Sequence, residues 1–475
     1  MAVNNSIPLP LVAFVQSQFP DLKISSKAAQ RLNTLIEYIV LRPIPHKTLP
    51  TAIFVRWKWI RHACCGNQSL EKKIKAHLLV RAPGYQREWY VGDAYHVNPE
   101  FRVNCMAAIR TYEPARGSGI QVQQELSEHP FCPMVPVNIP HMQWARGELE
   151  KWLKYLDGDT KTKPKELRTI IDLIRKKEGR KVWAGEFAEG TDNHELCPLK
   201  TSPKERSHAK VEELMAGVVI MIDIAINNDG CIPMNYRQSE NCPRWYSTGG
   251  MRSLQSCTKA LRMICMHGCI EYDIVSTNQT IAMYYAIANN LPHDELRCLI
   301  EHKQKCYSKL HKATKLPLDT VKTILLALGN SAPLVAPEHA RKLMWKLRFK
   351  HEALQSFQIP NAVLGAIWDE SRYRVADCLM RYNALQNNSF IQGYVAEMAA
   401  IEQHLKQSGK SKSLFGYAYQ VEVAAMTAMY QAMPSALIST FDAVVCANAE
   451  DCQLAETAMY DATGVPFKLK EIPYD

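Results

Sequence analysis

Several motifs that identify common enzyme classes and metal sites are missing from this sequence. Its 15 cysteines include no CxxC pair, which excludes a zinc ribbon, and in a chain of 475 residues their irregular spacing argues against a disulfide framework. A GxxxxGKS/T phosphate loop, a GxGxxG turn after a strand and an HExxH helix are also absent. The sequence therefore does not indicate a phosphate-loop NTPase, a dinucleotide-binding enzyme or a zinc protease.

Targeting and membrane-spanning features are lacking as well. Residues 1–14 contain no basic region followed by a long apolar core, so they do not resemble a signal peptide. The most apolar internal run, residues 215–226, contains Asp223 and is too short to cross a bilayer. We therefore expect a protein with no membrane partner that resides in a reducing cytoplasm.

The composition is that of a globular protein with a basic surplus. Hydrophobic residues make up 47% of the chain and charged residues 22%, which is ordinary for a folded protein. The 57 Lys and Arg exceed the 47 Asp and Glu, for a net charge of +10. This surplus suits a polyanionic partner such as nucleic acid, but it is also common in proteins that have none.

The chain divides into three regions. Residues 26–97, within an N-terminal domain of residues 1–100, predict three helices, near 26–40, over 54–65 and over 69–80. A hairpin at Gly92-Asp93 follows them, which is the order of a winged helix. The alternative is a solvated, structural helical domain. Residues 101–235 predict mostly helix, and residues 236–475 predict short strands interleaved with long helices, an α+β pattern. The basic side chains that would face phosphates in a winged helix are Lys58, Arg61, Lys72 and Lys73.

Two aspartates lie in apolar, strand-like stretches. Asp273 is near the end of the run 269–276, which precedes a segment with helical periodicity. Asp442 lies between ALIST and AVVCA, two strand-length pieces that predict a hairpin with the acid at its tip. A carboxylate among apolar side chains is costly unless it is paired or binds a metal, and neither strand contains Lys or Arg. For either position alone, a strand-end cap or turn former is the simpler interpretation.

Taken together, the two acids predict a metal site. Carboxylates on adjacent strands repel each other, and divalent cations would remove that repulsion. Two magnesium or manganese ions held by two aspartates are the apparatus of nucleotidyl transfer, because one ion activates the attacking 3′-hydroxyl and the other neutralises the triphosphate and the leaving pyrophosphate. We therefore predict Asp273 and Asp442 as the metal ligands and catalytic residues.

The chain between the two acids is rich in basic residues. Lys322 is predicted on a helix that ends at Gly329, and it follows a run of lysines that ends at Lys315. A lysine on a helix beside a metal site can hold a triphosphate as a point charge. A second basic cluster contains Arg341 and Lys342. The remaining lysines of the first run are Lys303, Lys305, Lys309 and Lys312.

The order of these residues resembles that in the palm domains of the DNA polymerase I family and of the phage-type single-subunit RNA polymerases. In those families a first Asp ends a strand before a helix with Ser and Gln, a fingers helix carries a Lys, a helix with Gln or His follows, and a hairpin supplies the second Asp. The positions that match in order are Asp273, Ser276, Gln279, Lys322, Gln420 and Asp442. Upstream, Arg244 is the candidate for the arginine of an arginine-aromatic segment that precedes the first Asp.

The resemblance covers about residues 236–475 and extends to uncharacterised plasmid and phage proteins that join a winged-helix-like start to such a palm. It implies a right-hand polymerase fold, with a thumb-like region at 101–235 and a palm at 236–475 that contains inserted fingers at about 292–360. It also implies a nucleotidyltransferase that acts on a nucleic-acid template, preferably DNA, and on NTP or dNTP. A second protein subunit is a further candidate partner. If a phage or plasmid encodes the chain, the host is bacterial and the location is the host cytoplasm.

The resemblance implies binding roles for two sets of side chains. The nucleotide-binding candidates are Lys322, Lys315, Ser276 and Gln279. The nucleic-acid-binding candidates are Arg244, Gln420, Glu422, Arg341 and Lys342. Of these, Gln420 and Glu422 are expected, with Tyr419, in the first turn of a helix over 415–433.

The sequence departs from the family pattern at several positions. Phe441 stands where the family has His before the second Asp, and Ala443 stands where a DNA polymerase often has Glu. Leu328 replaces an expected Tyr, and the following glycine comes two residues early. Gln279 and Thr280 occupy the region where DNA polymerases carry the Glu that excludes a 2′-hydroxyl, which slightly favours an RNA product.

Two other interpretations remain open. One is a plasmid or phage replication initiator or regulator that binds DNA through residues 26–97 and whose palm-like part is inactive. The other is a helical structural or assembly protein in which the acids are incidental. The second would bind neither magnesium nor nucleotide.

Overall fold

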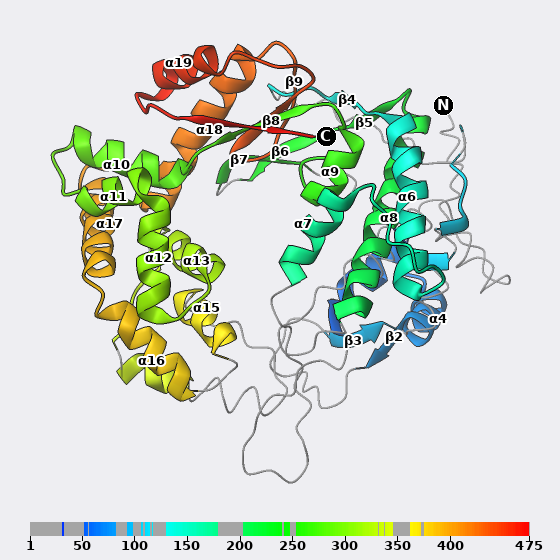
Figure 1. The fold of residues 1–475 in the computed structure, drawn as a ribbon, viewed down its shortest axis with the longest axis horizontal. Helices are drawn as coiled ribbons and strands as arrows, with labels where there is room; N and C mark the ends of the chain where they lie inside the picture. The colour runs from blue at the N-terminus through cyan, green and yellow to red at the C-terminus, as the bar shows by residue number, and fades with distance from the viewer. Residues whose placement is uncertain are drawn as a thin grey trace, which may run out of the picture.

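The structure of this chain, a computed structural model, contains both helices and strands (Figure 1). The buried hydrophobic side chains of the residues that the structure describes form three clusters. The α+β character predicted for residues 236–475 is confirmed at this level. The structure describes residues 31–32, 52–55, 57–81, 93–97, 106–107, 110–114, 116, 130–178, 203–239, 242–247, 253–330, 332–336, 338–344, 362–371 and 375–474.

The described residues between 52 and 97 contain three strands and two helices. Strand β3 pairs antiparallel with both β1 and β2, so the sheet order is β1-β3-β2. The helix expected to run through residue 80 ends earlier, because its last residues leave the helix and pair with β3. The first half of the predicted hairpin, residues 86–92, lies outside the described residues. The elements are β1 (Ala52–Val55), α3 (Trp57–Ala63), α4 (Gln68–Leu78), β2 (Leu79–Arg81) and β3 (Asp93–Val97).

A second unit consists of three long helices that share one hydrophobic cluster. Helix α6 starts where the Asn138 side chain accepts a hydrogen bond from the amide of His141 at 3.0 Å, and it ends at Gly158, whose φ of 94° suits glycine. Beside it, strands β4 (Met134–Pro136) and β5 (Cys231–Pro233) pair antiparallel. The helices are α6 (Ile139–Asp157), α7 (Arg168–Glu178) and α8 (Pro203–Asn227), which lie on the right in Figure 1.

The central sheet has four antiparallel strands in the order β11-β8-β10-β9. Alternate residues face opposite sides. Val445 faces the cluster that also holds α6, α8 and α9 (Lys259–Cys265), whereas Val444 and Tyr272 face the cluster that holds α18 (Leu414–Ala432) and α19 (Cys452–Thr463). The sheet is thus buried on both faces. Its strands are β8 (Ile270–Ile274), β9 (Ala436–Ser439), β10 (Ala443–Cys446) and β11 (Leu469–Pro473).

A third helical unit lies on the other side of the sheet from α6–α8 (Figure 1). It has its own hydrophobic cluster, which runs from Ala282 to Leu414. The insertion expected at 292–360 therefore belongs to a longer helical run, in which 345–361 are outside the described residues. Its helices are α10 (Thr277–Ala288), α11 (Asp294–Glu301), α12 (Lys303–Thr314), α13 (Leu318–Gly329), α15 (Ala362–Glu370), α16 (Val375–Gln386) and α17 (Ser389–Gln407).

Helix α18 connects the third unit to the sheet. It packs on α19, on β9 and β10, and on β7 (Cys242–Ser247), which pairs with β6 (Tyr236–Ser239). The predicted helix is confirmed, but the predicted first-turn position of its polar residues is wrong. The helix begins at Leu414 after the Ser413 cap, so Tyr419 and Gln420 lie in its second turn and Glu422 in its third.

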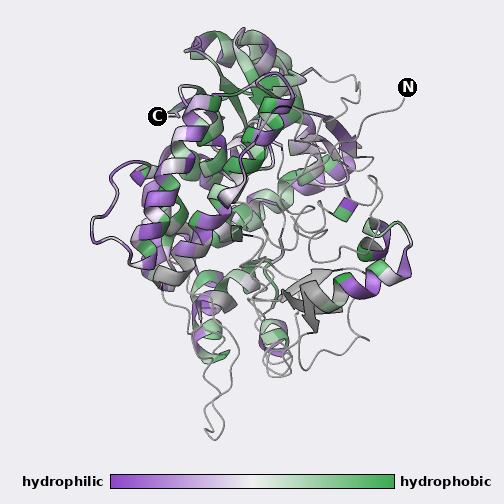
Figure 2. Ribbon diagram, turned by 90° about the vertical axis from the view of Figure 1, so that its right-hand side faces the viewer, coloured by the Kyte–Doolittle hydropathy of each residue, from purple (hydrophilic) through white to green (hydrophobic). Residues whose placement is uncertain are grey.

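The hydropathy of the residues follows this architecture. In Figure 2 the strands of the central sheet are mostly hydrophobic, and the outer helices alternate hydrophilic and hydrophobic residues along their length. Among the described residues, no helix combines the length and the apolar character needed to cross a bilayer.

Candidate active site

The sheet brings the two predicted aspartates to neighbouring strands. Asp273 is the fourth residue of β8, and its register partner on β10 is Ala443, the residue that follows Asp442. The backbone N–H of Ile274 donates to the carbonyl oxygen of Asp442 at 2.9 Å. Both the predicted strand end at Asp273 and the predicted hairpin with Asp442 at its tip are confirmed. Residues 169 positions apart in the chain are therefore adjacent in space.

Two residues in the left-handed backbone region flank these acids. Phe441, in the tight turn before Asp442, has a φ of 68°, and Ser276, in the turn after β8, has a φ of 55°. The turn at Phe441 is closed by the bond from Thr440 N–H to the Ala443 carbonyl, at 2.7 Å. A non-glycine residue in this conformation costs about 1–2 kcal/mol. Such strain persists where the surrounding structure imposes it, and it is concentrated at functional sites.

The environment of Asp273 disfavours its charge. Its side chain is half-buried, and its pKa is raised from 3.8 to about 6. Burial is the largest cause, followed by the negative charges of Asp442 and Glu271. Lys259 and Lys470, the latter directly across from Asp273 on β11, offset part of this effect. A bound cation would favour the ionised form.

The pKa of Asp442 is also raised. Its side chain is accessible to solvent, but protein atoms surround it closely enough that burial is again the largest cause. A hydrogen bond to its own backbone and the positive charges of Arg244 and Lys322 lower the pKa by less.

Replacing Asp273 with Asn should remove a pH-dependent cost to stability. Because the pKa of Asp273 is raised to about 6 in the folded chain, the folded state binds this proton more tightly than the unfolded state, and stability is lost as pH rises through 6. Without divalent ions, the melting temperature of Asp273→Asn should exceed that of the wild type by about 2 °C or more at pH 8. The difference should vanish near pH 4. An equal difference at both pH values would contradict the assignment.

These two acids fit divalent magnesium or manganese. No group of three or more His, Cys, Asp or Glu that could hold a metal occurs among the described residues. Magnesium in nucleotide-processing sites typically takes one or two carboxylates and fills its other positions with water and substrate phosphates. The nearby Glu271 is already engaged, because one oxygen accepts from Lys259 Nζ at 2.5 Å and the other accepts from the Tyr474 hydroxyl. Asp273 and Asp442 are therefore the residues that would hold the ions.

Lysines from the third helical unit face this pair. Lys322 lies on α13 with an exposed side chain, and its charge acts on Asp442. Lys303, the first residue of α12, donates from Nζ to the hydroxyl of Ser276 at 2.9 Å. Lys315 ends α12 with a φ of 55° and an exposed side chain. Lys322 and Ser276 thus lie close to the acids, whereas no contact ties Lys315 to them.

Gln279 points into the helical core. It lies on α10, is 9% exposed, and its side chain hydrogen-bonds that of Tyr394 on α17. Its amide also lies near Gly329, the last residue of α13. Its visible role is to join α10, α13 and α17, so any effect on nucleotide binding would act through their packing.

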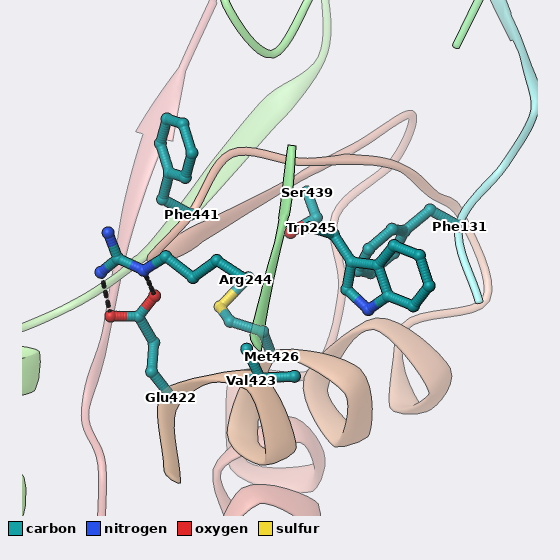
Figure 3. A pocket seen from close by; sticks show the side chains of 8 residues that line it. All are labelled: Phe131, Arg244, Trp245, Glu422, Val423, Met426, Ser439 and Phe441. Atoms are coloured by element: carbon teal, nitrogen blue, oxygen red, sulfur yellow. Dashed lines mark hydrogen bonds and ion pairs between the residues drawn. The ribbon is translucent and has the colours of Figure 1, made fainter. Parts of the chain in front are cut away.

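Arg244 and Glu422 form a buried ion pair beside Asp442. The guanidinium Nε donates to a Glu422 oxygen at 2.6 Å, and an Nη donates to the other oxygen (Figure 3). The two side chains are 19% and 2% exposed. The Arg244 guanidinium also lies 3.8 Å from the ring centre of Tyr419 and 5.7 Å from that of Phe441. Glu422 is thus placed to hold Arg244 under the hairpin that carries Asp442.

The remaining predicted nucleic-acid contacts are exposed. Gln420 has an exposed side chain on α18, two residues from Glu422. Arg341 and Lys342 are exposed on a helical stretch at 338–344 whose Ala340 and Met344 belong to the hydrophobic cluster of the third helical unit. No contact connects these two basic residues with the aspartates.

Sequence reasoning assigned no role in this site to three of its residues, Glu271, Lys470 and Lys303. Glu271 lies two positions before Asp273 on the same face of β8, and strand alternation alone could have suggested it. Lys470 reaches Asp273 only through the pairing of β11 with β8. Lys303 was part of the lysine run, but its contact with Ser276 depends on how α12 packs.

Comparison with solved structures finds 47 matching chains. The chain is similar to the POL domain of Pol1 from M. smegmatis, in complex with DNA primer-template and dNTP, with a TM-score of 0.36 and 14% sequence identity over 71% of this chain and 66% of that one. The chain thus spans just under two thirds of that domain. No protein-family profile and no curated protein matches it. A likeness at this level supports no conclusion about activity, which has to come from the site residues.

Proposed function

We propose that this chain is a template-directed nucleic-acid polymerase, a nucleotidyltransferase that uses two divalent metal ions. The observation that carries the proposal is the adjacency of Asp273 and Asp442 on paired strands, where each carboxylate has a raised pKa. Mutual repulsion and burial make this pair costly unless it binds cations. The lysines that face it supply the charge that a triphosphate would need.

Different residues of the chain would have different roles in nucleotidyl transfer. When bound, magnesium ions would supply the activation of a 3′-hydroxyl and the neutralisation of the leaving pyrophosphate. Asp273 and Asp442 would hold the ions, and Lys322 would bind the triphosphate. Lys315 would act as a second, more distant charge at the end of α12, and Ser276 would position groups beside Asp273. Gln279 would keep α13 in place for Lys322.

The arrangement of the central sheet and the two helical groups beside it supports a right-hand architecture. The central sheet would be the palm, helices α10–α17 the fingers, and helices α6–α8 the thumb-like part. In Figure 1 the two helical groups lie on opposite sides of the sheet that carries the acids. This is the placement that would let a duplex contact both groups while its end meets the sheet.

Contacts to the template and product would come from the second set of predicted residues. Arg244, held by Glu422 next to Asp442, would contact the strand end at the site. Gln420 on α18, and Arg341 and Lys342 in the fingers, would contact the backbone or bases further away. The net charge of +10 agrees with a polyanionic partner. We further propose a cytoplasmic location and retain a second protein subunit as a partner of the full assembly.

Labelled nucleotide incorporation on single-stranded DNA tests the proposal. We expect magnesium-dependent incorporation that disappears in EDTA, with NTPs used somewhat better than dNTPs. Reactions with and without a primer would define the start, and a salt series would show a steep loss of template affinity. Absence of incorporation from NTPs and dNTPs on DNA and RNA templates, in both magnesium and manganese, would contradict it.

A second candidate function is a plasmid or phage replication initiator or regulator that binds duplex DNA. The observation that favours it is the order of β1, α3, α4, β2 and β3 with the sheet order β1-β3-β2, which matches a winged helix. Lys72 and Lys73 are exposed on α4. Sequence-specific duplex binding that Lys72→Glu abolishes, in a full-length chain that incorporates no nucleotide, would favour this function. A structural or assembly protein would show no thermal shift with magnesium or nucleotide.

A further inference from the structure

Lys303 carries a half-buried positive charge that has no carboxylate partner. It is the first residue of α12, and its Nζ donates one hydrogen bond, to the Ser276 hydroxyl at 2.9 Å. It makes no ion pair with any carboxylate of the described chain. An ammonium group has three N–H donors, and a single neutral hydroxyl satisfies one of them. A half-buried ammonium group with unsatisfied donors would be stabilised by an anion.

The surroundings of Lys303 show which kind of anion fits. The pKa of Lys303 is lowered, first by burial and then by the charge of Lys322, while Asp273 raises it. Helices α12 and α13 pack together, and the charge of Lys322 acts on both Lys303 and Asp442, while the charge of Asp273 acts on Lys303. A ligand bound among these groups would meet two cations and two metal-binding carboxylates. An anion with many oxygens could accept hydrogen bonds from both lysines and also coordinate a metal ion held by the carboxylates.

We propose that Lys303 and Lys322 together bind the oligophosphate group of a nucleoside triphosphate, and that Ser276 holds Lys303 in place until the phosphate takes over as acceptor. This inference rests on the proposed polymerase function and adds a residue to its substrate site. Ser276 lies three residues after Asp273 in the strained turn that follows β8. Lys303 therefore contacts the turn that directly follows the strand carrying Asp273. The oligophosphate would lie beside Asp273 and not along the outer face of α12.

Binding of magnesium tripolyphosphate to the full chain, measured by isothermal titration calorimetry, tests the proposal without base, template or turnover. Lys303→Met should weaken binding about 10- to 100-fold, the range for loss of a hydrogen bond to a charged group. Lys303→Arg should retain binding within about threefold, because it keeps the charge and the donors. Lys305→Met is the matched control, since Lys305 is exposed on the same helix. Its binding should match that of the wild type.

A second titration separates two sources of phosphate. An abasic oligonucleotide presents backbone phosphodiesters and no terminal oligophosphate, and its affinity should not change in Lys303→Met. If that affinity falls while tripolyphosphate binding stays at the wild-type level, the proposal is overturned in favour of a backbone contact. Equal tripolyphosphate binding by Lys303→Met and the wild type overturns it as well. Thermal melting of Lys303→Met at or above the wild-type temperature would confirm that the variant is folded.

The same titrations distinguish failure of this inference from failure of the polymerase proposal. If the wild type incorporates no nucleotide on any template but Lys303→Met still loses tripolyphosphate binding, the polymerase proposal fails and the oligophosphate site stands. If the wild type incorporates nucleotides and Lys303→Met binds tripolyphosphate normally, the polymerase proposal stands and the role of Lys303 is overturned.

Discussion

Asp442→Asn should abolish nucleotide incorporation while leaving the fold intact. Asn keeps the shape of the side chain but removes the negative charge that would hold a divalent ion, and a bound metal contributes several kcal/mol of charge stabilisation in the transition state. A loss of about 4 kcal/mol corresponds to a rate about a thousandfold lower. The measurement is steady-state incorporation of labelled nucleotide at saturating magnesium. Template affinity, measured separately, should remain within about twofold because phosphate contacts by basic residues supply it.

The melting temperature of Asp442→Asn distinguishes a loss of catalysis from a loss of folding. Burial raises the pKa of Asp442 despite the opposing charges of Arg244 and Lys322, so removing its charge should leave the melting temperature unchanged or higher. Asp461→Asn is the control, because Asp461 is exposed on α19 and is not among the groups whose charge chiefly shifts the pKa of Asp273 or of Asp442. It should retain full activity. Wild-type rates in Asp442→Asn would remove the catalytic proposal, whereas equal losses in both variants would point to a nonspecific effect.

Arg244→Met should destabilise the chain by about 3–5 kcal/mol, the usual cost of leaving a buried charge without its partner. Glu422 is 2% exposed, and its pKa is already raised because burial outweighs the attraction of Arg244. Without the arginine, this carboxylate must either remain charged in an apolar setting or take up a proton. The loss should therefore shrink as pH falls. Urea unfolding followed by tryptophan fluorescence measures it, and Trp245 is in the same pocket.

A double replacement tests the reason for that loss. Arg244→Met with Glu422→Leu removes both charges and keeps apolar volume, and such pairs are often as stable as the original ion pair. We expect the double variant to recover most of the stability lost in Arg244→Met. A loss below about 1 kcal/mol in the single variant, the level of an exposed ion pair, would show that the buried pair is not formed. A double variant as unstable as Arg244→Met would show that packing, and not charge, decides the outcome.

The local features of the site were predictable because they depend on neighbours in sequence. Two strand-length apolar pieces on either side of Asp442, with almost no turn formers between them, predict two short paired strands, and β9 and β10 are found there. Likewise, the apolar run before Asp273 predicts β8, and Lys322 lies on a helix that ends at Gly329 as expected. Hydrophobic periodicity carries such information because it sets which face of each element can be buried.

Other features could not be predicted because they depend on how distant segments pack. The sequence suggested that Gln279 and Glu422 would contact ligands, but Gln279 lies in the helical core and Glu422 pairs with Arg244, 178 residues away. The end of the predicted helix at Leu79 became a strand because β3 was available to pair with it. Side-chain partners of this kind are set by three-dimensional proximity, which residue spacing does not encode.

The amino-acid sequence by itself determined that two acids lie at the ends of short apolar strands, and that a lysine-rich helical segment separates them. Only the tertiary structure decided that β8 and β10 are neighbours, that Lys470 lies across from Asp273, and that α12 delivers Lys303 to Ser276. The physical reason is that strand formation follows local periodicity, whereas the electrostatic character of a site depends on charges brought within a few ångströms by long-range packing.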